Sequence, residues 1–248
     1  MALKETYERQ GEFLFRGRSY LPLLAAPLVV AALLDPQYLH PSLTGFSGCL
    51  WQAACILISL TGFVIRCLVA GYVPKGTSGR NTQTQVAESL NTTGLYSVVR
   101  NPLYLGNFLI ILGLLLFIQV WWFAFAGIAI FWIFYERIIF TEESFLRQKF
   151  GATFVDWSLK TPVFIPNLKH WKKPELLYAW KTMLRREHST QFGMISALTL
   201  LGVAGDLFTK PDHKISMFWF IFFGTSLAIY LVLRYLKKKT QVLNIEGR

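Results

Sequence analysis

Long apolar runs alternate with short polar segments along this chain of 248 residues. A helix needs roughly 20 apolar residues to cross the hydrocarbon core of a bilayer. We predict about six membrane-spanning helices, at about 20–34, 49–70, 103–117, 120–140, 192–208 and 217–236. The first is short and contains Pro22 and Pro27, whereas the third and fourth nearly touch and should form a tight hairpin. The expected fold is an all-α, multi-pass transmembrane bundle formed by one membrane domain, 1–248.

Composition agrees with this prediction, since 53% of the residues are hydrophobic and only 16% are charged, which is not typical of a soluble domain. The segment "MALKETYERQGEFLFRGRSY" contains acidic residues and no small-residue cleavage site, so we do not expect a removable signal peptide. Cys49, Cys55 and Cys67 have no metal-site spacing, and the four histidines are scattered over loops. We therefore expect no disulfide framework and no metal site.

The net charge of +11 predicts a topology, because Lys and Arg are retained on the cytoplasmic side. With the N-terminus inside, only Lys210 and Lys214 fall outside. We expect both termini and the active site on the cytoplasmic face, of the inner membrane in a bacterium or the endoplasmic reticulum in a eukaryote. Anionic membrane lipids would be attracted to this face. No basic stripe with interleaved exposed aromatics stands apart from the membrane flanks, so nucleic acid is not an expected partner.

Two polar segments separate the predicted spans. The connection 71–95 is rich in Gly, Thr, Ser and Asn, and loops of this length often cover ligands. The segment 168–191 contains "KKPELLYAWKTMLRRE", in which Pro174 would start a helix with apolar and basic residues on opposite faces. This pattern predicts an amphipathic helix that lies at the membrane interface, followed by an extra transmembrane hairpin at 192–236.

The stretch "YSVVRNPLYLGN" places polar residues directly before an apolar helix. Pro102 is favoured in the first turn of a helix, so Arg100 and Asn101 should lie at the mouth of the third span. A purely structural interpretation is an arginine that snorkels to the interface and an asparagine that caps the helix.

A second cluster, "FYERIIFTEESFLRQKFG", starts inside an apolar segment and continues out of it. Ionisable residues at membrane depth are costly, so Arg137 indicates a site or a partner. Glu142 and Glu143 follow. Their structural interpretation is an exposed ion pair of Glu143 with Arg147 one turn on, worth about 0.3–0.5 kcal/mol.

In order, the motifs are Arg-Asn-Pro-x-Tyr-x-Gly, a hairpin, Arg137, Glu142-Glu143, Phe150-Gly151, Trp157 and "TPVFIPN". This order resembles the isoprenylcysteine carboxyl methyltransferase and phospholipid methyltransferase superfamily of membrane enzymes. The resemblance covers about 62–167 and includes an arginine at Arg66, within an expected core of about 49–167. The family usually has His at the position of Asn101, and Asn cannot act as a base near pH 7.

The resemblance implies an S-adenosylmethionine-dependent methyltransferase whose cofactor binds to a cytoplasmic helical C-terminal region. It places Asn101, Tyr104 and Gly106 along the cofactor pocket, with Glu142 and Glu143 on the cofactor's amino or ribose groups. Arg100 and Arg137 would act as the catalytic residues that face a lipid or lipidated acceptor from the bilayer. Arg16, Arg18 and Arg80 are further candidates for binding a polyanionic head group.

An anionic acceptor oxygen needs an arginine clamp and no base, which favours a prenylcysteine carboxylate or a lipid phosphate such as that of lipid A. N-methylation of a phospholipid amine is an alternative that needs a free glutamate as the base. Membrane sterol reductases share a similar layout and use NADPH, but they more typically have Arg-Asp-Glu where this chain has "TEES". A non-enzymatic membrane protein that retains the fold is the remaining alternative.

Overall fold

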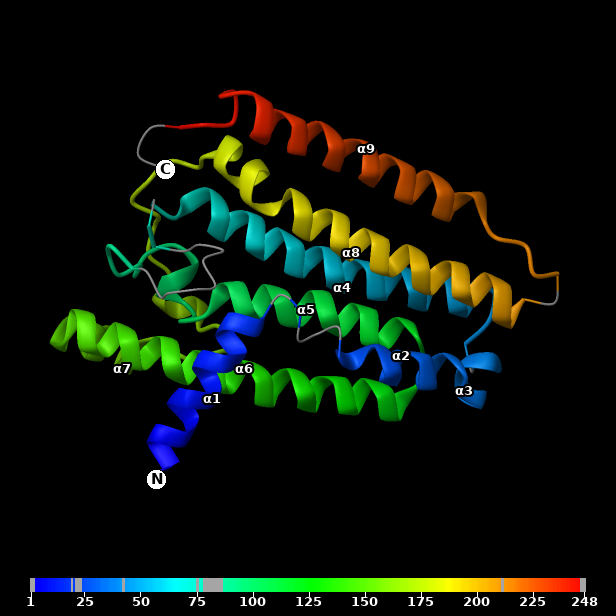
Figure 1. Cartoon of the computed structure of the whole chain (residues 1–248), viewed down its shortest axis with the longest axis horizontal. Coiled ribbons are helices and arrows are strands. Elements are labelled where there is room, and N and C mark those ends of the chain that lie inside the picture. Colours follow the sequence, from blue (N-terminus) through cyan, green and yellow to red (C-terminus); the bar gives the residue numbers. More distant parts are fainter. Residues whose placement is uncertain are drawn as a thin grey trace.

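The computed structural model describes residues 3–18, 20, 24–41, 43–74, 76–77, 87–210 and 212–245. Within these ranges the chain is helical and forms no strand, which confirms the all-α fold. The α-helices are α1 (Leu3–Gly17), α2 (Ala26–Leu33), α3 (Pro36–Leu39), α4 (Gly45–Tyr72), α5 (Pro102–Phe117), α6 (Trp121–Phe150), α7 (Ala152–Lys160), α8 (Trp180–Thr209) and α9 (Met217–Lys239). Short 3-10 helices occur at Leu95–Ser97 and Leu168–His170. The long helices lie side by side in an elongated bundle (Figure 1).

Four helices of the described chain, α4, α6, α8 and α9, are long and apolar enough to cross a membrane, and α5 is a shorter apolar helix. The prediction of a spanning helix at 20–34 is wrong. Residues 21–23 of this segment are outside the described residues, and the described part contains α2, which has 8 residues and would extend only about 12 Å. The chain then turns at Asp35, whose carboxylate accepts a hydrogen bond of 2.8 Å from the Gln37 N–H at the start of α3.

The predicted hairpin of the third and fourth spans is confirmed as α5 and α6. Pro102 is the first residue of α5, as expected. The second helix, α6, continues past the apolar segment to Phe150, so the Glu142-Glu143 pair lies on the same continuous helix as Arg137. This helix ends because Gly151 adopts φ 53°, a conformation that favours glycine, while its N–H donates to the Arg147 carbonyl at 3.0 Å.

A separate interfacial helix starting at Pro174 is not present. Residues 171–179 are non-helical, and the helix starts at Trp180 and continues without a break through the fifth predicted span to Thr209. The amphipathic pattern from Lys181 onward therefore belongs to the first turns of α8. Backbone hydrogen bonds hold both ends of this segment to other parts of the chain: Gly94 N–H donates to the Lys172 carbonyl at 3.0 Å, and Ala179 N–H donates to the Gly71 carbonyl at 2.8 Å.

Close contact between α4 and α5 forms the centre of the bundle. A side chain on Gly106 would come within 2.6 Å of Arg66 Cγ and 2.8 Å of the Gly62 carbonyl oxygen, so only glycine fits at this contact. Small residues are common where membrane helices approach closely. Helix α8 packs on α4 and α9, and α1 packs on α6.

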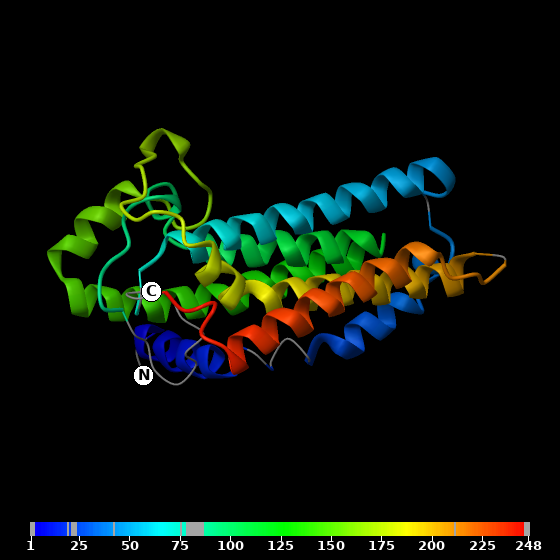
Figure 2. The same cartoon turned by 90° about the horizontal axis from the view of Figure 1, so that it is seen from above.

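The elements that carry the motifs gather at one end of the bundle. Helices α1 and α7, the segment 87–100 and the end of α9 all lie there, whereas α3 and the α8–α9 connection lie at the opposite end (Figure 1, Figure 2). Of the predicted loop 71–95, residues 75 and 78–86 are outside the described residues, and so is Arg80.

Candidate active site

Backbone hydrogen bonds hold the "TPVFIPN" segment against the start of α5. Arg100 N–H donates to the Pro162 carbonyl at 2.8 Å, and Asn167 N–H donates to the Val98 carbonyl at 2.9 Å. The Asn101 side chain adds a third bond, from Nδ2 to the Val163 carbonyl at 3.2 Å. Two motifs that are about 60 residues apart in the sequence are therefore adjacent.

The capping interpretation of Asn101 is wrong, because its side chain makes no hydrogen bond to the N-terminal N–H groups of α5. Instead the amide positions the 161–167 segment, as described above. This is a role that an amide can perform with its NH₂ donor.

The two adjacent glutamates of α6 each contact a different arginine. Glu142 accepts a hydrogen bond of 2.8 Å from the Tyr104 hydroxyl, and its Oε1 lies 3.9 Å from Arg18 Nη1. Glu143 Oε2 lies 3.3 Å from Arg100 Nη1. The pairing of Glu143 is therefore with an arginine from another element, and the i,i+4 pair with Arg147 is not the main contact.

Two polar atoms in this cluster have spare hydrogen-bonding capacity. Arg100 Nε and Glu143 Oε1 are both buried, and neither has a hydrogen-bond partner among the described residues. Buried polar atoms in native proteins are usually paired. A polar ligand that accepts a hydrogen bond from Arg100 Nε and donates one to Glu143 Oε1 would satisfy both atoms.

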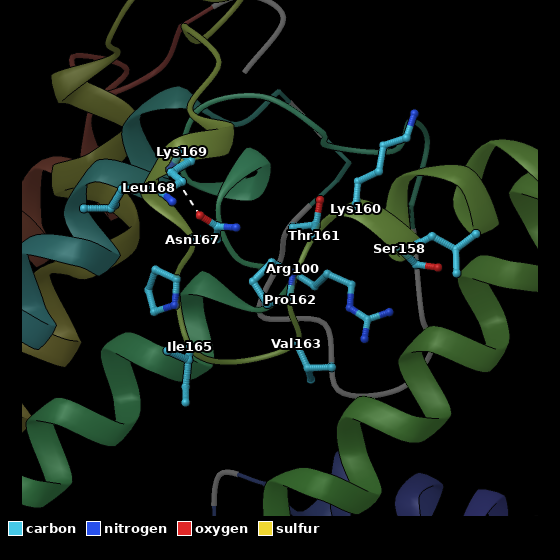
Figure 3. A pocket seen from close by; sticks show the side chains of 12 residues that line it. Arg100, Ser158, Lys160, Thr161, Pro162, Val163, Ile165, Asn167, Leu168 and Lys169 are labelled. Carbon is cyan, nitrogen blue, oxygen red and sulfur yellow. Dashed lines mark hydrogen bonds between the residues drawn. The ribbon is translucent and has the colours of Figure 1, made fainter.

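An open pocket of about 710 Å³ lies beside this cluster. It is lined by Arg100 and by residues 158–163 and 165–169, which connect the end of α7 to the "TPVFIPN" segment (Figure 3). The volume is in the range of small-molecule binding sites. Arg100 therefore contacts both the glutamate cluster and the pocket.

Aromatic residues fix the position of α7, whose end lies next to the pocket. Trp157, which the motif order includes, donates from Nε1 to the Tyr96 carbonyl at 3.1 Å and so fixes α7 against the 95–97 turn. Burial raises the pKa of the Tyr96 hydroxyl, and nearby Glu142 raises it further, because both disfavour a phenolate. Tyr96 is thus a neutral hydroxyl at physiological pH and not a base.

Arg137 lies in a different place from the other site residues. Its guanidinium carbon is 3.6 Å from the centre of the Tyr7 ring, and its nitrogens contact Gln10 at 3.2 Å and Glu136 at 2.7 Å. Five helical positions separate Arg137 from Glu142, which is a rotation of about 140° around α6. The structure therefore places Arg137 in the contact between α1 and α6.

Gly106 also differs from the other residues expected at the cofactor pocket. It is two positions from Tyr104, a rotation of about 200° around α5. Tyr104 faces Glu142 on α6, whereas Gly106 faces Gly62 and Arg66 on α4. The close packing of α5 on α4 therefore explains why position 106 is a glycine.

A buried polar network that the sequence interpretation did not describe lies next to the site. Arg66 and Glu187 form a bidentate ion pair, with Nε–Oε2 and Nη2–Oε1 distances of 2.8 and 3.0 Å. Arg66 also donates to Asn107 at 2.5 Å, and Asn107 donates to the Tyr135 hydroxyl at 3.0 Å. The Tyr135 ring packs on Tyr104 with 4.8 Å between centroids. The sequence signal for this network was Arg66, an arginine inside a long apolar segment. The sequence did not identify the partner of this arginine.

Comparisons with known proteins match the segment that contains these motifs. Residues 50–153 match the family described as phospholipid methyltransferase. The cobalt-zinc-cadmium resistance protein CzcN of Cupriavidus metallidurans is 38% identical over 97 residues, which are 37% of this chain and 39% of that protein. The alignment thus spans well under half of this curated relative. No solved structure matches the chain.

Proposed function

From the match of residues 50–153 to the phospholipid methyltransferase family, we propose that this membrane protein transfers a methyl group from S-adenosylmethionine to an anionic oxygen of a lipid acceptor. The family supports the general class, a membrane methyltransferase. The cofactor, the acceptor and the roles of individual residues form the proposal.

The pairing of both glutamates with arginines is the observation that carries the acceptor assignment. Methylation of an ammonium group requires a base that first removes a proton. Glu142 and Glu143 are the acidic residues of the cluster, and each contacts an arginine, Arg18 and Arg100 respectively, so neither carboxylate can act as a base without changing an arginine contact. An anionic oxygen needs no base, so it suits this site better than an amine.

The residues of the site fit the proposed cofactor. Carboxylates bind an ammonium group and hydroxyl donors well, and Glu142 with Tyr104 would hold these groups. The unpartnered Glu143 Oε1 and Arg100 Nε add one acceptor and one donor. When bound, S-adenosylmethionine supplies a methyl carbon on a sulfonium: an acceptor lone pair forms the new C–O bond while the C–S electron pair returns to sulfur.

We propose that Arg100 binds the anionic oxygen of the acceptor. Its side chain is 16% exposed, it lines the open pocket, and its guanidinium can hold an anionic oxygen in a fixed orientation. Alignment of this kind is the main requirement for a displacement at a methyl carbon. The negative charge of the acceptor also offsets the net positive charge of the cofactor within a partly buried site.

We further propose that the end of the bundle that carries α1, α7 and the pocket faces the cytoplasm, where S-adenosylmethionine is made. The excess of Lys and Arg in the segments at this end supports the assignment.

Purified full-length protein in detergent micelles, incubated with methyl-labelled S-adenosylmethionine and a total lipid extract, tests the proposal. We expect a labelled lipid in which the methyl group is on a phosphate or carboxylate oxygen, and no labelling with Glu142→Gln. Label on an amine nitrogen would instead identify a phospholipid N-methyltransferase. Saturable NADPH binding without S-adenosylmethionine binding would identify a reductase, and binding of neither would support a non-enzymatic protein.

A further inference from the structure

The N-terminal helix α1 and the residue that follows it reach the candidate active site. We infer that α1 is part of this site and that Arg18, together with Arg100, binds a phosphorylated lipid head group. The inference rests on the proposed function for its chemistry. Arg18 lies outside the family match at 50–153.

Helix α1 is packed directly on α6. A side chain at Gly11 would collide with the Thr141 side chain and the Arg137 carbonyl, so the two backbones meet without a gap. Thr141 Oγ1, which donates to the Arg137 carbonyl at 3.0 Å, also lies 3.4 Å from the Glu8 carbonyl oxygen, and the Tyr7 ring covers Arg137 at 3.6 Å. These contacts place α1 along the cytoplasmic half of α6 that carries the glutamates.

Phe15 joins the end of α1 to the interior of the site. It is 6% exposed and belongs to one apolar cluster with Tyr104 and Ile138, against which Phe164 of the "TPVFIPN" segment also packs. Burial of a phenylalanine side chain contributes roughly 1.5–3 kcal/mol. The position of α1 is therefore fixed by the same residues that form the site.

Arg18 is oriented toward Glu142 by this packing. Its guanidinium carbon lies over the Phe15 ring at 4.2 Å, and its Nη1 is 3.9 Å from Glu142 Oε1. Charge-assisted hydrogen bonds are shorter, about 2.7–2.9 Å. A phosphate oxygen could approach this guanidinium more closely than Glu142 does.

The number of arginines selects a phosphate over a carboxylate. Arg18 and Arg100 contact neighbouring glutamates on α6 and come from separate segments of the chain, directly after α1 and directly before α5. When one oxygen of a carboxylate takes the methyl group, one oxygen remains for two guanidinium groups. A phosphate monoester has three terminal oxygens, so two remain, one for each arginine.

Binding of a fluorescent phosphatidic acid to the full-length protein in detergent micelles, without cofactor, tests the inference directly. We expect the dissociation constant of Arg18→Ala to be about tenfold higher than that of the parent, and Arg18→Lys to recover part of the loss, since Lys binds phosphate as a point charge. The matched control is Arg16→Ala, because Arg16 is two positions earlier, in the last turn of α1, and its side chain is exposed. It should bind like the parent.

Three results would overturn the inference: unchanged binding by Arg18→Ala, equal binding of phosphatidylcholine and phosphatidic acid by the parent, or displacement of the lipid by an equal concentration of inorganic phosphate. Thermal unfolding midpoints of all variants serve as the folding control, and Arg18→Gln replaces the alanine variant if the latter unfolds. In the methyl-transfer assay we expect Arg18→Ala to raise KM for the lipid by a larger factor than KM for S-adenosylmethionine. If the parent transfers no methyl group but its lipid binding still depends on Arg18, the proposed function is rejected and the inference about Arg18 stands.

Discussion

The Tyr104 hydroxyl donates a hydrogen bond of 2.8 Å to Glu142 Oε1 and thereby joins α5 to α6 at the candidate site. Tyr104 is 9% exposed, and its ring packs on Tyr135. The bond lies between the two arms of the hairpin, so it orients a carboxylate that would otherwise be free to rotate. It also links the site to the Arg66 network through the contact of the Tyr104 and Tyr135 rings, which are tilted by 54°.

Removal of this hydroxyl tests whether Glu142 is oriented for the cofactor. We expect Tyr104→Phe to weaken S-adenosylmethionine binding about tenfold, while stability falls by only about 1 kcal/mol, the usual contribution of one hydrogen bond. Calorimetric titration measures the first and thermal unfolding the second. Tyr235→Phe is the control, since Tyr235 is 62% exposed. Equal affinity of Tyr104→Phe and the parent would argue against a cofactor role for Glu142.

Variants of Arg100 and Glu143 distinguish a catalytic role of Arg100 from a structural role. Arg100→Ala should lower kcat/KM about 100-fold or more and also destabilise the protein, because it leaves a partly buried carboxylate without its arginine partner. In the double variant Arg100→Ala/Glu143→Gln the charge is removed, so stability should recover while methyl transfer stays low. Recovery of activity together with stability would show that Arg100 has only a structural role.

The Arg66 and Glu187 ion pair is expected to be a major contributor to stability. Both side chains are nearly buried, at 13% and 5% exposed. Arg66→Ala should cost about 3–5 kcal/mol because it leaves Glu187 charged and unpaired, whereas Arg66→Met/Glu187→Met should be close to the parent. Chemical unfolding in micelles measures both.

The control for this experiment is the exposed pair of Lys4 and Glu8, whose side chains are 71% and 34% exposed. Lys4→Ala should change stability by less than about 1 kcal/mol. If Arg66→Ala behaves like Lys4→Ala, the network around Arg66 is not a determinant of stability.

Gly106 tests the packing of α4 on α5. Gly106→Ala should destabilise the protein by about 1–3 kcal/mol, because the added carbon would overlap Arg66 and the Gly62 carbonyl. Gly224→Ala is the matched control on α9: a carbon there meets no other atom within 4 Å, so the higher helix propensity of Ala should leave stability unchanged or slightly higher. A neutral Gly106→Ala would mean that the two helices separate easily.

Arg137 distinguishes a direct catalytic role from a role in docking α1. If it positions α1, then Arg137→Ala and Tyr7→Ala should have the same effect, a several-fold higher KM for the lipid, because both remove the cation–π contact, which is worth about 0.5–2 kcal/mol. Limited proteolysis near Gly17 should accelerate equally in both variants. A loss of kcat in Arg137→Ala with full activity in Tyr7→Ala would instead place Arg137 at the acceptor, as the sequence predicted.

The sequence by itself determined the class of the fold and the order of the motifs. Apolar run lengths identified the long helices because a bilayer imposes a minimum length, and Pro102 identified the start of α5 because proline is favoured in a first helical turn. The family resemblance also came from the sequence, since short motifs in a fixed order need no coordinates, and the match at 50–153 confirms it.

Only the tertiary structure decided which residues meet. Helical periodicity relates residues within one helix, so it suggested Arg147 as the partner of Glu143, whereas packing between elements pairs Glu143 with Arg100 and Glu142 with Arg18. The same limit applies to Arg137 and Gly106, which share motifs with site residues but point to other helices. Likewise, the contact of α1 with α6 depends on a glycine whose importance is visible only when the facing backbone is known.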